Sequence, residues 1–304
     1  MMRILVTGAS GFVGKATVNA LSKRDGIEIH AVYNRRQPEA VGNVTWHKAD
    51  ILNKEEAETL IANICPSHLL HLAWCAEHGT YWKDHTNLTW LSASINIAQH
   101  FIKYGGKRCL VLGTSAEYDW AGSEPLNEFT TPLIPLGLYG GSKLGLYWAL
   151  KRYFEQESIS WIWTRLFNPF GPGEDPRRLI PKTCLRLLRG EHISFDAGLS
   201  RRDFLFVDDV GSALVHALLS EAVGPVNIAS GNPVSIRDVI SQIAYQYDCS
   251  DLVTFDGPDT ANEKIDVVIA DITRLQKECN WHPEKNFQER LKETCEWWKI
   301  NKSK

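Results

Sequence analysis

Short apolar runs alternate with longer amphipathic segments through the first half of the chain. The apolar runs have the length and composition of buried strands, which we expect over residues 3–8, 27–33, 43–51, 68–74, 107–115 and 159–168. The intervening segments repeat their apolar positions at helical spacing, and we expect helices over residues 12–24, 54–63 and 83–104 and from Tyr139 onward. This alternation predicts an α/β fold of the Rossmann type, in which a doubly wound parallel sheet is covered by helices on both faces.

The pattern changes after Asn168. The segment PFGPGEDPRR at 169–178 is rich in proline, glycine and charge, which is typical of a linker or a binding loop. Its Arg177 and Arg178 could reach a phosphate, but the preferred reading is a solvated loop. Shorter, mixed elements follow, and a last helix is expected to end at 293–299. We therefore expect a smaller, mixed C-terminal lobe.

Composition and charge narrow the class of protein. The 304 residues are 44% hydrophobic and 23% charged with a net charge of −3, which gives no reason to expect nucleic acid as a partner. We find neither the roughly 18 apolar residues of a membrane helix nor a signal peptide. Seven scattered cysteines fit a reduced, cytoplasmic chain. No metal is expected, because His68 and His71 lie on a predicted core strand without a third ligand.

The first turn of the chain carries a glycine pattern that suits phosphate binding. TGASGFVG at 7–14 places Gly8, Gly11 and Gly14 between a predicted strand and a predicted helix. Glycines there allow a tight turn and a close approach to a pyrophosphate, whose charge is stabilised at the helix N-terminus. This context favours a dinucleotide site over a glycine-rich turn without a ligand.

The end of the second predicted strand indicates which dinucleotide binds. A cofactor with a free ribose 2′-hydroxyl usually meets an Asp or Glu at this point, whereas this chain has Asn34, Arg35 and Arg36. Guanidinium groups suit a 2′-phosphate because they form paired, charge-assisted hydrogen bonds. We therefore expect NADP(H) rather than NAD(H); a solvated surface loop is the alternative reading of the two arginines.

Tyr139 and Lys143 lie four positions apart in LYGGSK and therefore share one face of a helix. A free phenol has a pKa of about 10 and is a poor acid–base group near neutral pH. A nearby ammonium and the positive charge of an oxidised nicotinamide favour the phenolate, and lowering the pKa to about 7 requires about 4 kcal/mol of differential interaction. We expect Tyr139 to exchange a proton with a carbonyl or alcohol of the substrate, assisted by Lys143.

Further motifs cover most of the chain. In their sequence and order the chain resembles the extended short-chain dehydrogenase/reductases, which act on nucleotide sugars as NAD(P)-dependent epimerases, dehydratases and reductases. The motifs are TGASGFVG (7–14), ADI (49–51), HLAW (71–74), LGTSAEY (112–118), YGGSK (139–143), RLFNPFGPG (165–173), RRDFLFVDDV (201–210) and VNIASGNPVSIRDVI (226–240). The resemblance implies a nucleotide-sugar substrate. It also implies a dinucleotide-binding domain over 1–167, to which segments near 203–230 return, and a sugar-nucleotide-binding lobe over 168–304.

The resemblance also assigns roles to residues. Thr114 would complete the catalytic set with Tyr139 and Lys143, and Ser115 is the close alternative. The residues implied for the cofactor are Gly8, Gly11, Phe12, Val13, Gly14, Asn34, Arg35, Arg36, Asp50, Ile51, Leu72, Ala73, Trp74, Tyr139, Lys143 and Phe167. The residues implied for the substrate are Ser115, Ala116, Asn168 and Arg202.

The reaction depends on the position two residues before Tyr118. Dehydratases of this group typically carry a glutamate there and one kind of epimerase-reductase a cysteine, so Ala116 disfavours both. Two readings remain, of which the two arginines after the second strand favour the first. One is NADPH-dependent reduction of a 4-keto-6-deoxy nucleotide sugar with Tyr139 as general acid, and the other is 4-epimerisation with a retained NAD. A regulatory NADP(H) sensor without catalysis is disfavoured, because Thr114, Tyr139 and Lys143 are all present.

Two charged residues near these motifs have open roles. Glu117 follows Ala116, and we expect it to face away from the substrate because successive residues of an extended strand alternate faces. Arg202 is implied to pair with a substrate phosphate, and a salt bridge to Asp203 or Asp209 is its structural alternative.

The segment 75–82 departs from simpler members of the group. Its His78, Tyr81 and Trp82 either shape the sugar pocket or pack in the core. Relatives commonly dimerise by packing two long helices from each subunit. The resemblance therefore implies a homodimer through helices near 83–104 and 139–157.

Overall fold

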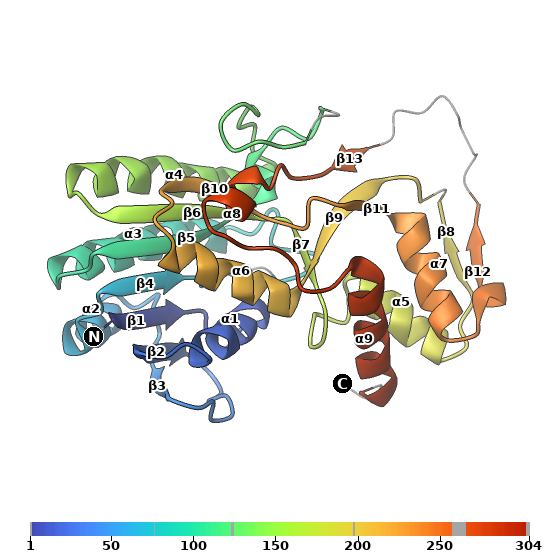
Figure 1. The fold of residues 1–304 in the computed structure, drawn as a ribbon, viewed down its shortest axis with the longest axis horizontal. Helices are drawn as coiled ribbons and strands as arrows, with labels where there is room; N and C mark the ends of the chain where they lie inside the picture. Colours follow the sequence, from blue (N-terminus) through green and yellow to red (C-terminus); the bar gives the residue numbers. More distant parts are fainter. Residues whose placement is uncertain (1, 76, 123–124, 197, 257–265, 302–304) are drawn as a thin grey trace.

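Seven parallel strands form the main sheet of the molecule (Figure 1). The computed structural model describes residues 2–301 apart from 76, 123–124, 197 and 257–265. Across the sheet the strands are β10 (Gly224–Ile228), β6 (Ser160–Leu166), β5 (Arg108–Thr114), β4 (His68–His71), β1 (Met2–Thr7), β2 (Ile27–Tyr33) and β3 (Val44–Lys48). The order reverses between β1 and β4, where such sheets open a crevice at the carboxyl ends of their strands. The predicted doubly wound α/β sheet is confirmed.

Alternate side chains of the strands supply two separate cores. Ile4 and Val6 of β1 point into one apolar cluster and Leu5 into the other, and all three are fully buried. The first cluster lies under α1 (Phe12–Ser22) and α6 (Val207–Leu219), and the second lies under α2 (Lys54–Ile64), α3 (Thr86–Lys103) and α4 (Gly137–Gln156). Burial on both faces explains why the strands read as continuous apolar runs.

The C-terminal lobe contains a smaller, mixed sheet. β9 (Arg201–Phe206) runs antiparallel to β11 (Pro233–Ser235) and parallel to β7 (Asn168–Phe170) and β13 (Val267–Val268). β8 (Ile193–Phe195) pairs separately with β12 (Val253–Phe255). The remaining elements are α5 (Leu179–Leu188), α7 (Ile236–Gln246), α8 (Thr273–Lys277), α9 (Phe287–Ile300) and the short 3₁₀ helices η1 (Ser115–Glu117) and η2 (Ser250–Leu252).

The chain crosses between the two sheets more than once. After β9 it forms α6, which packs against α1, and then β10, which extends the main sheet beside β6 (Figure 1). The start of β5 is tied to this returning segment by Arg108, whose guanidinium donates to the carbonyl oxygens of Leu218 and Ala222 at 2.6 and 2.8 Å. The lobes are therefore joined through the sheet itself.

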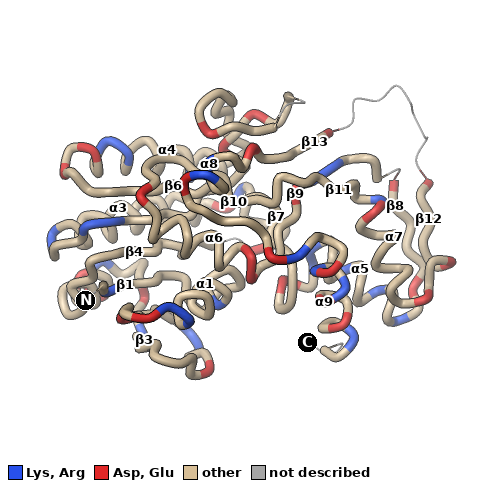
Figure 2. The backbone as a smooth tube through the Cα atoms, viewed as in Figure 1, with Lys and Arg blue, Asp and Glu red and all other residues tan. Residues whose placement is uncertain are grey.

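Charge is distributed over both lobes. Figure 2 shows Lys and Arg interspersed with Asp and Glu along the backbone. Among the helices that the structure describes, we find none that is both long enough and apolar enough to cross a bilayer.

Candidate active site

A cleft of about 1380 Å³ opens where the carboxyl ends of β1, β2, β4 and β5 meet. Single small-molecule pockets usually measure about 300–1,000 Å³, so this cleft has room for a dinucleotide and a second ligand. Its lining includes all of the residues predicted for the cofactor: Gly8, Gly11, Phe12, Val13, Gly14, Asn34, Arg35, Arg36, Asp50, Ile51, Leu72, Ala73, Trp74, Tyr139, Lys143 and Phe167. Thr114, Ser115, Ala116 and Asn168 line it as well.

The turn between β1 and α1 fits a phosphate group. Gly8 has φ +69°, and a Cβ atom there would lie 2.7 Å from the backbone nitrogen of Ala73, so this position requires glycine. Gly11 is the N-cap of α1 and provides no side-chain cap, and the first turn holds no acidic residue. The first backbone N–H groups of α1 are therefore free of a competing side chain, and they face a site suited to an anion.

Three residues bring hydroxyl, phenol and ammonium groups together at the other end of the cleft. Thr114 ends β5, and its hydroxyl lies close enough to the phenol of Tyr139, in the first turn of α4, to lower the pKa of that phenol. Lys143 follows one turn later and is 3% exposed. Its Nζ donates to the carbonyl oxygen of Leu112 at 2.7 Å and lies 3.9 Å from the ring centroid of Trp74.

The protonation of this group differs from the sequence expectation. Burial raises the pKa of Tyr139 above its usual range, although the hydrogen bond with Thr114 opposes the change. Burial also lowers the pKa of Lys143 to about 7. Lys143 by itself does not lower the pKa of Tyr139 in this arrangement, because its Nζ contacts Leu112 and Trp74 and burial of the phenol outweighs the favourable contacts.

The segment after β4 fixes the start of α4. The carbonyl oxygen of Trp82 accepts from the backbone N–H groups of Leu138 and Tyr139 at 3.0 and 3.3 Å. Gly137, the first residue of α4, has φ +62°, and a Cβ atom there would lie 2.9 Å from the same carbonyl oxygen. Helix α4 therefore begins two residues before the predicted start, and Tyr139 is held by an adjoining loop.

Aromatic side chains surround Tyr139 on several sides. The ring centroids of Tyr81, Trp82 and Trp74 lie 4.9, 5.8 and 6.5 Å from that of Tyr139, each in an edge-on arrangement. Asn87 holds two of them, since it accepts from Nε1 of Trp74 at 2.8 Å and donates to the carbonyl oxygen of Tyr81 at 2.7 Å. Of the two readings left open for Tyr81 and Trp82, the structure favours a place in the pocket wall.

Glu117 lies behind the site in a fully buried polar network. Its carboxylate accepts from the backbone N–H of Thr114 at 2.8 Å, from Nε1 of Trp163 at 2.9 Å and from Nε of Arg165 at 2.8 Å. Arg165 also donates to the hydroxyl of Tyr118 at 3.1 Å. Glu117 is absent from the lining of the cleft, as expected, but it lies in the 3₁₀ helix η1 and not in the extended strand on which that expectation was based.

Arg202 is not brought to the cleft. Its guanidinium pairs with the carboxylate of Asp266, whereas its two sequence-based alternatives, Asp203 and Asp209, have other partners. Because Asp266 lies far from Arg202 in the sequence, residue spacing could not predict this ion pair. The substrate role of Arg202 stays a prediction, and His78 is likewise outside the residues that line the cleft.

The sequence analysis missed a buried carboxyl in the cleft wall. Glu174 is 6% exposed, and its Oε1 lies 3.1 Å from Nε of Arg178. Burial raises the pKa of Glu174 from 4.5 to about 8, although Arg178 opposes the shift. The sequence offered one sign of this pair, since a glutamate four residues before an arginine can form an ion pair with it. The segment was nevertheless interpreted as a solvated loop.

Replacing Glu174 with Gln should stabilise the protein at alkaline pH. Between pH 4.5 and 8 the folded chain retains a proton that the unfolded chain releases, so wild-type stability falls as the pH rises through this window. Urea unfolding should show similar stabilities for both proteins at pH 5 and an advantage of roughly 3–5 kcal/mol for Glu174→Gln at pH 9. The exposed Glu296→Gln variant is the control, and identical pH profiles for all three proteins would refute the prediction.

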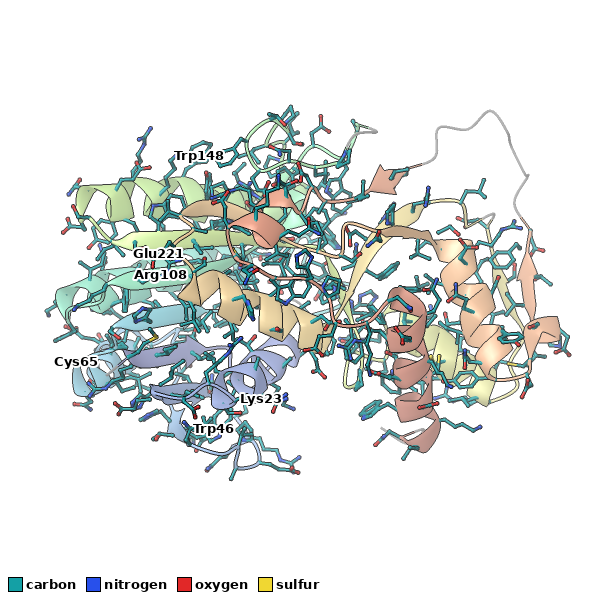
Figure 3. The ribbon with its side chains drawn as sticks, viewed as in Figure 1. Lys23, Trp46, Cys65, Arg108, Trp148 and Glu221 are labelled. Atoms are coloured by element: carbon teal, nitrogen blue, oxygen red, sulfur yellow. The ribbon has the colours of Figure 1, made fainter. Side chains whose placement is uncertain are left out.

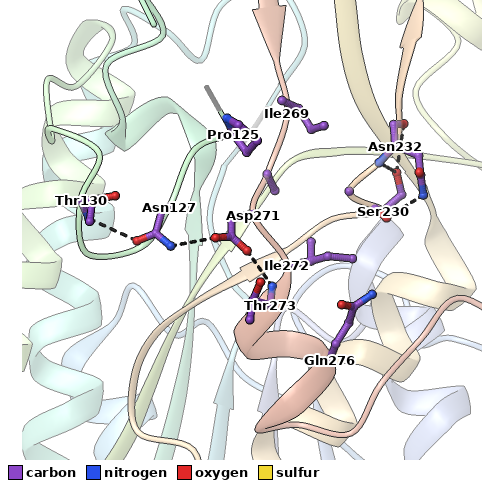
Figure 4. A pocket seen from close by; sticks show the side chains of 12 residues that line it. Pro125, Asn127, Thr130, Ser230, Asn232, Ile269, Asp271, Ile272, Thr273 and Gln276 are labelled. Atoms are coloured by element: carbon purple, nitrogen blue, oxygen red, sulfur yellow. Dashed lines mark hydrogen bonds between the residues drawn. The ribbon is translucent and has the colours of Figure 1, made fainter. Parts of the chain in front are cut away.

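A second hollow lies on another part of the molecule (Figure 4). Its polar side chains are engaged with one another: Nδ2 of Asn127 donates to Asp271 at 2.9 Å, and Thr273 donates its backbone N–H to the same carboxylate at 2.8 Å. No group of three or more potential metal ligands occurs in the described part of the chain. We therefore place the candidate active site in the larger cleft.

Comparison with known proteins agrees with this geometry. The model of the NAD dependent epimerase/dehydratase family matches residues 4–229. UDP-glucuronate 4-epimerase of Thermodesulfobacterium geofontis is 26% identical over 321 residues, which cover 98% of this chain and 96% of that protein. The dTDP-glucose 4,6-dehydratase of Neisseria meningitidis serogroup B is 25% identical over 346 residues, covering 100% and 95%.

Solved structures show the same fold. UDP-glucose 4-epimerase of Thermotoga maritima with UDP-glucose superposes with a TM-score of 0.85 at 22% identity, covering 99% of each chain. UDP-glucose 4-epimerase of Thermus thermophilus with NAD superposes with a TM-score of 0.83 at 25% identity, covering 98% of this chain and 99% of that one.

Proposed function

The chain belongs to the NAD dependent epimerase/dehydratase family, and from this membership we propose that it interconverts the C4 epimers of a nucleotide sugar. It is an NAD(P)-dependent enzyme that acts on nucleotide sugars. The observation that carries the proposal is the meeting of Thr114, Tyr139 and Lys143 in one cleft with the glycine turn of α1. Relatives that are 4-epimerases support epimerisation over the reduction that the sequence analysis favoured.

The residues of the site have separate tasks in this reaction. The nicotinamide would supply the acceptor and then the donor of a hydride at C4. Tyr139 takes the proton of the 4-hydroxyl during oxidation and returns one to the 4-keto oxygen during reduction. Thr114 hydrogen-bonds the same oxygen, and Lys143 holds a ribose hydroxyl. Reduction on the opposite face of the sugar inverts C4 with no net oxidation.

The choice between NAD(H) and NADP(H) depends on the end of β2. Arg35 and Arg36 line the cleft with their side chains exposed, as a site for a 2′-phosphate requires. This observation supports NADP(H), and it also favours a second candidate function, reduction of a 4-keto-6-deoxy nucleotide sugar by NADPH.

Removing both guanidinium groups should change the affinity for NADP(H) but not the affinity for NAD(H). We expect Arg35→Ala/Arg36→Ala to weaken NADP(H) binding by roughly tenfold or more, because charged hydrogen bonds contribute about 1.5–3 kcal/mol each, and to leave NAD(H) binding nearly unchanged. Titration of protein fluorescence with each dinucleotide measures both constants. Equal affinity of the wild type and the variant for NADP(H) would show that the arginines are only a solvated loop.

A product analysis tests the proposed reaction. The purified protein is incubated with UDP-glucose, UDP-glucuronate or dTDP-glucose and with NAD or NADP, and the sugar is examined by proton NMR. Appearance of the C4 epimer without a net change in nicotinamide absorbance supports the epimerase. Stoichiometric oxidation of NADPH with a 4-keto-6-deoxy nucleotide sugar, and no epimer, would favour the reductase instead. If neither reaction occurs, both candidates fail.

The quaternary structure stays a prediction. Helices α3 and α4 pack side by side on one face of the sheet. Leu88 on α3 and Trp148 on α4 are 51% and 46% exposed, and Trp148 is labelled in Figure 3. Their exposure supports the proposed homodimer through these helices. Sedimentation of the purified protein measures the mass.

A further inference from the structure

The loop between β7 and α5 contains a buried carboxyl group that the proposed reaction does not use. Glu174 is 6% exposed, and its Oε2 atom has no hydrogen-bond partner among the residues that the structure describes. Its other oxygen contacts Nε of Arg178 at 3.1 Å. Burying a carboxyl in this way is costly. What the arrangement achieves is to fix the position of one arginine.

Arg178 is held where its charge acts on the reactive end of the cleft. It lines the cleft together with Tyr81 and Tyr139. Its positive charge lowers the pKa of both phenols, against the larger opposing effect of burial. Its ion pair with Glu174 approaches through Nε, and we find no hydrogen bond from its terminal N–H groups to any residue that the structure describes. The terminal N–H groups of the guanidinium, whose planar fork matches two oxygens of a carboxylate or phosphate, are therefore left for a ligand.

Two other arginines of the C-terminal lobe are already neutralised. Arg177 pairs with Asp175 at 2.6 Å and lies 3.5 Å from Glu77, and Arg202 pairs with Asp266. Neither lines the cleft.

The position of Arg178 at the start of α5 also favours the binding of an anion. Arg178 is the N-cap of this ten-residue helix, and its side chain makes no capping hydrogen bond. The positive end of the helix dipole therefore lies beside the guanidinium. Burial also raises the pKa of Glu174 to about 8, so near neutral pH the carboxyl does not fully cancel the charge of its partner.

We propose that Arg178, positioned by the buried Glu174, binds an oxyanion of the substrate, either a diphosphate oxygen or a carboxylate carried by the sugar. The inference rests on the proposed function for its choice of a nucleotide sugar as ligand. It differs from the sequence expectation, which gave this task to Arg202 and left Arg178 in solvent.

Binding measured without turnover tests the proposal. Calorimetry with UDP, UDP-glucose and UDP-glucuronate, and with dTDP and dTDP-glucose, is compared between the wild type and Arg178→Gln. We expect the variant to lose roughly tenfold or more in affinity. An equal loss for every ligand identifies the diphosphate, and a loss confined to UDP-glucuronate identifies the sugar carboxylate. Unchanged affinity, or a wild type that binds none of these ligands, overturns the proposal.

Matched variants separate this inference from folding and from the proposed reaction. Arg177→Gln removes the neighbouring, already paired arginine and should leave affinity unchanged, and a loss equal to that of Arg178→Gln overturns the assignment. If the wild type binds these ligands without epimerising them, the proposed reaction fails while the binding comparison stays valid. If the wild type epimerises these ligands and Arg178→Gln binds them as tightly as the wild type does, the role of Arg178 fails while the proposed reaction stands.

The positioning role of Glu174 has its own readout. Glu174→Ala should raise the KM for the nucleotide sugar while kcat and the affinity for the dinucleotide stay close to wild type, because the residue acts through Arg178. Glu174→Gln keeps an oxygen near Nε and should restore most of the lost affinity. A fall in kcat with unchanged KM, or no rescue by Gln, would overturn the role.

Discussion

Replacing Tyr139 with Phe is expected to lower kcat by about 10²–10⁴, the usual contribution of a positioned acid–base group. Phe keeps the ring that packs against Tyr81, Trp82 and Trp74 and removes only the hydroxyl. The aromatic wall should therefore stay in place, and the affinity for the dinucleotide should change little. Rates of C4 epimerisation and cofactor titration measure the two effects.

The matched control lies on the same helix. Tyr153 is half-buried in the later part of α4, and Tyr153→Phe removes the same group far from Thr114. This variant should retain wild-type turnover. A Tyr139→Phe protein that turns over as fast as the wild type would exclude this phenol as the proton carrier and with it the proposed mechanism.

The largest loss of stability is expected from Glu117→Gln. Glu117 and Arg165 are both fully buried, and the carboxylate accepts from Nε of the guanidinium at 2.8 Å. Removing one charge leaves the other buried without compensation, which costs about 3–5 kcal/mol in comparable pairs. Chemical denaturation at neutral pH measures the loss. Turnover should fall as well, because the carboxylate also holds the backbone N–H of Thr114.

Two further variants show whether burial is the cause. Glu28 pairs with Arg3 at 3.0 Å near the surface, where solvent screens the charges, and Glu28→Gln should cost much less stability than Glu117→Gln. The double variant Glu117→Gln/Arg165→Met removes both buried charges and should recover part of the stability lost by the single variant. If Glu117→Gln is no more destabilising than Glu28→Gln, the network has no structural importance.

Much of the fold could be predicted from the sequence because each strand of the main sheet is buried on both faces. Ile4, Leu5 and Val6 illustrate this, since an uninterrupted apolar run followed by Gly8 reads as a central strand and a turn. The edges of elements were predicted less well. The start of α4 depends on Trp82, which is distant in sequence and caps the helix through its backbone.

The chemistry of the site was predicted in part. The residues proposed for cofactor binding and catalysis could be selected because motifs specify them locally, and all of them line one cleft. Their ionisation could not be predicted, since the pKa of Tyr139 depends on how many rings enclose it. The pairing of Arg202 with Asp266 and the burial of Glu174 likewise depend on tertiary packing. No spacing rule covers such contacts.

The hydrogen bonds from Leu138 and Tyr139 to Trp82 have a consequence for engineering this enzyme. Substrate range in such proteins is commonly altered by exchanging surface loops. Here the segment that forms one wall of the cleft also fixes the position of Tyr139, the proposed proton carrier. A graft that replaces residues 77–84 would therefore shift the phenol along with the wall, and a new specificity would have to be introduced by side-chain changes on an unaltered backbone.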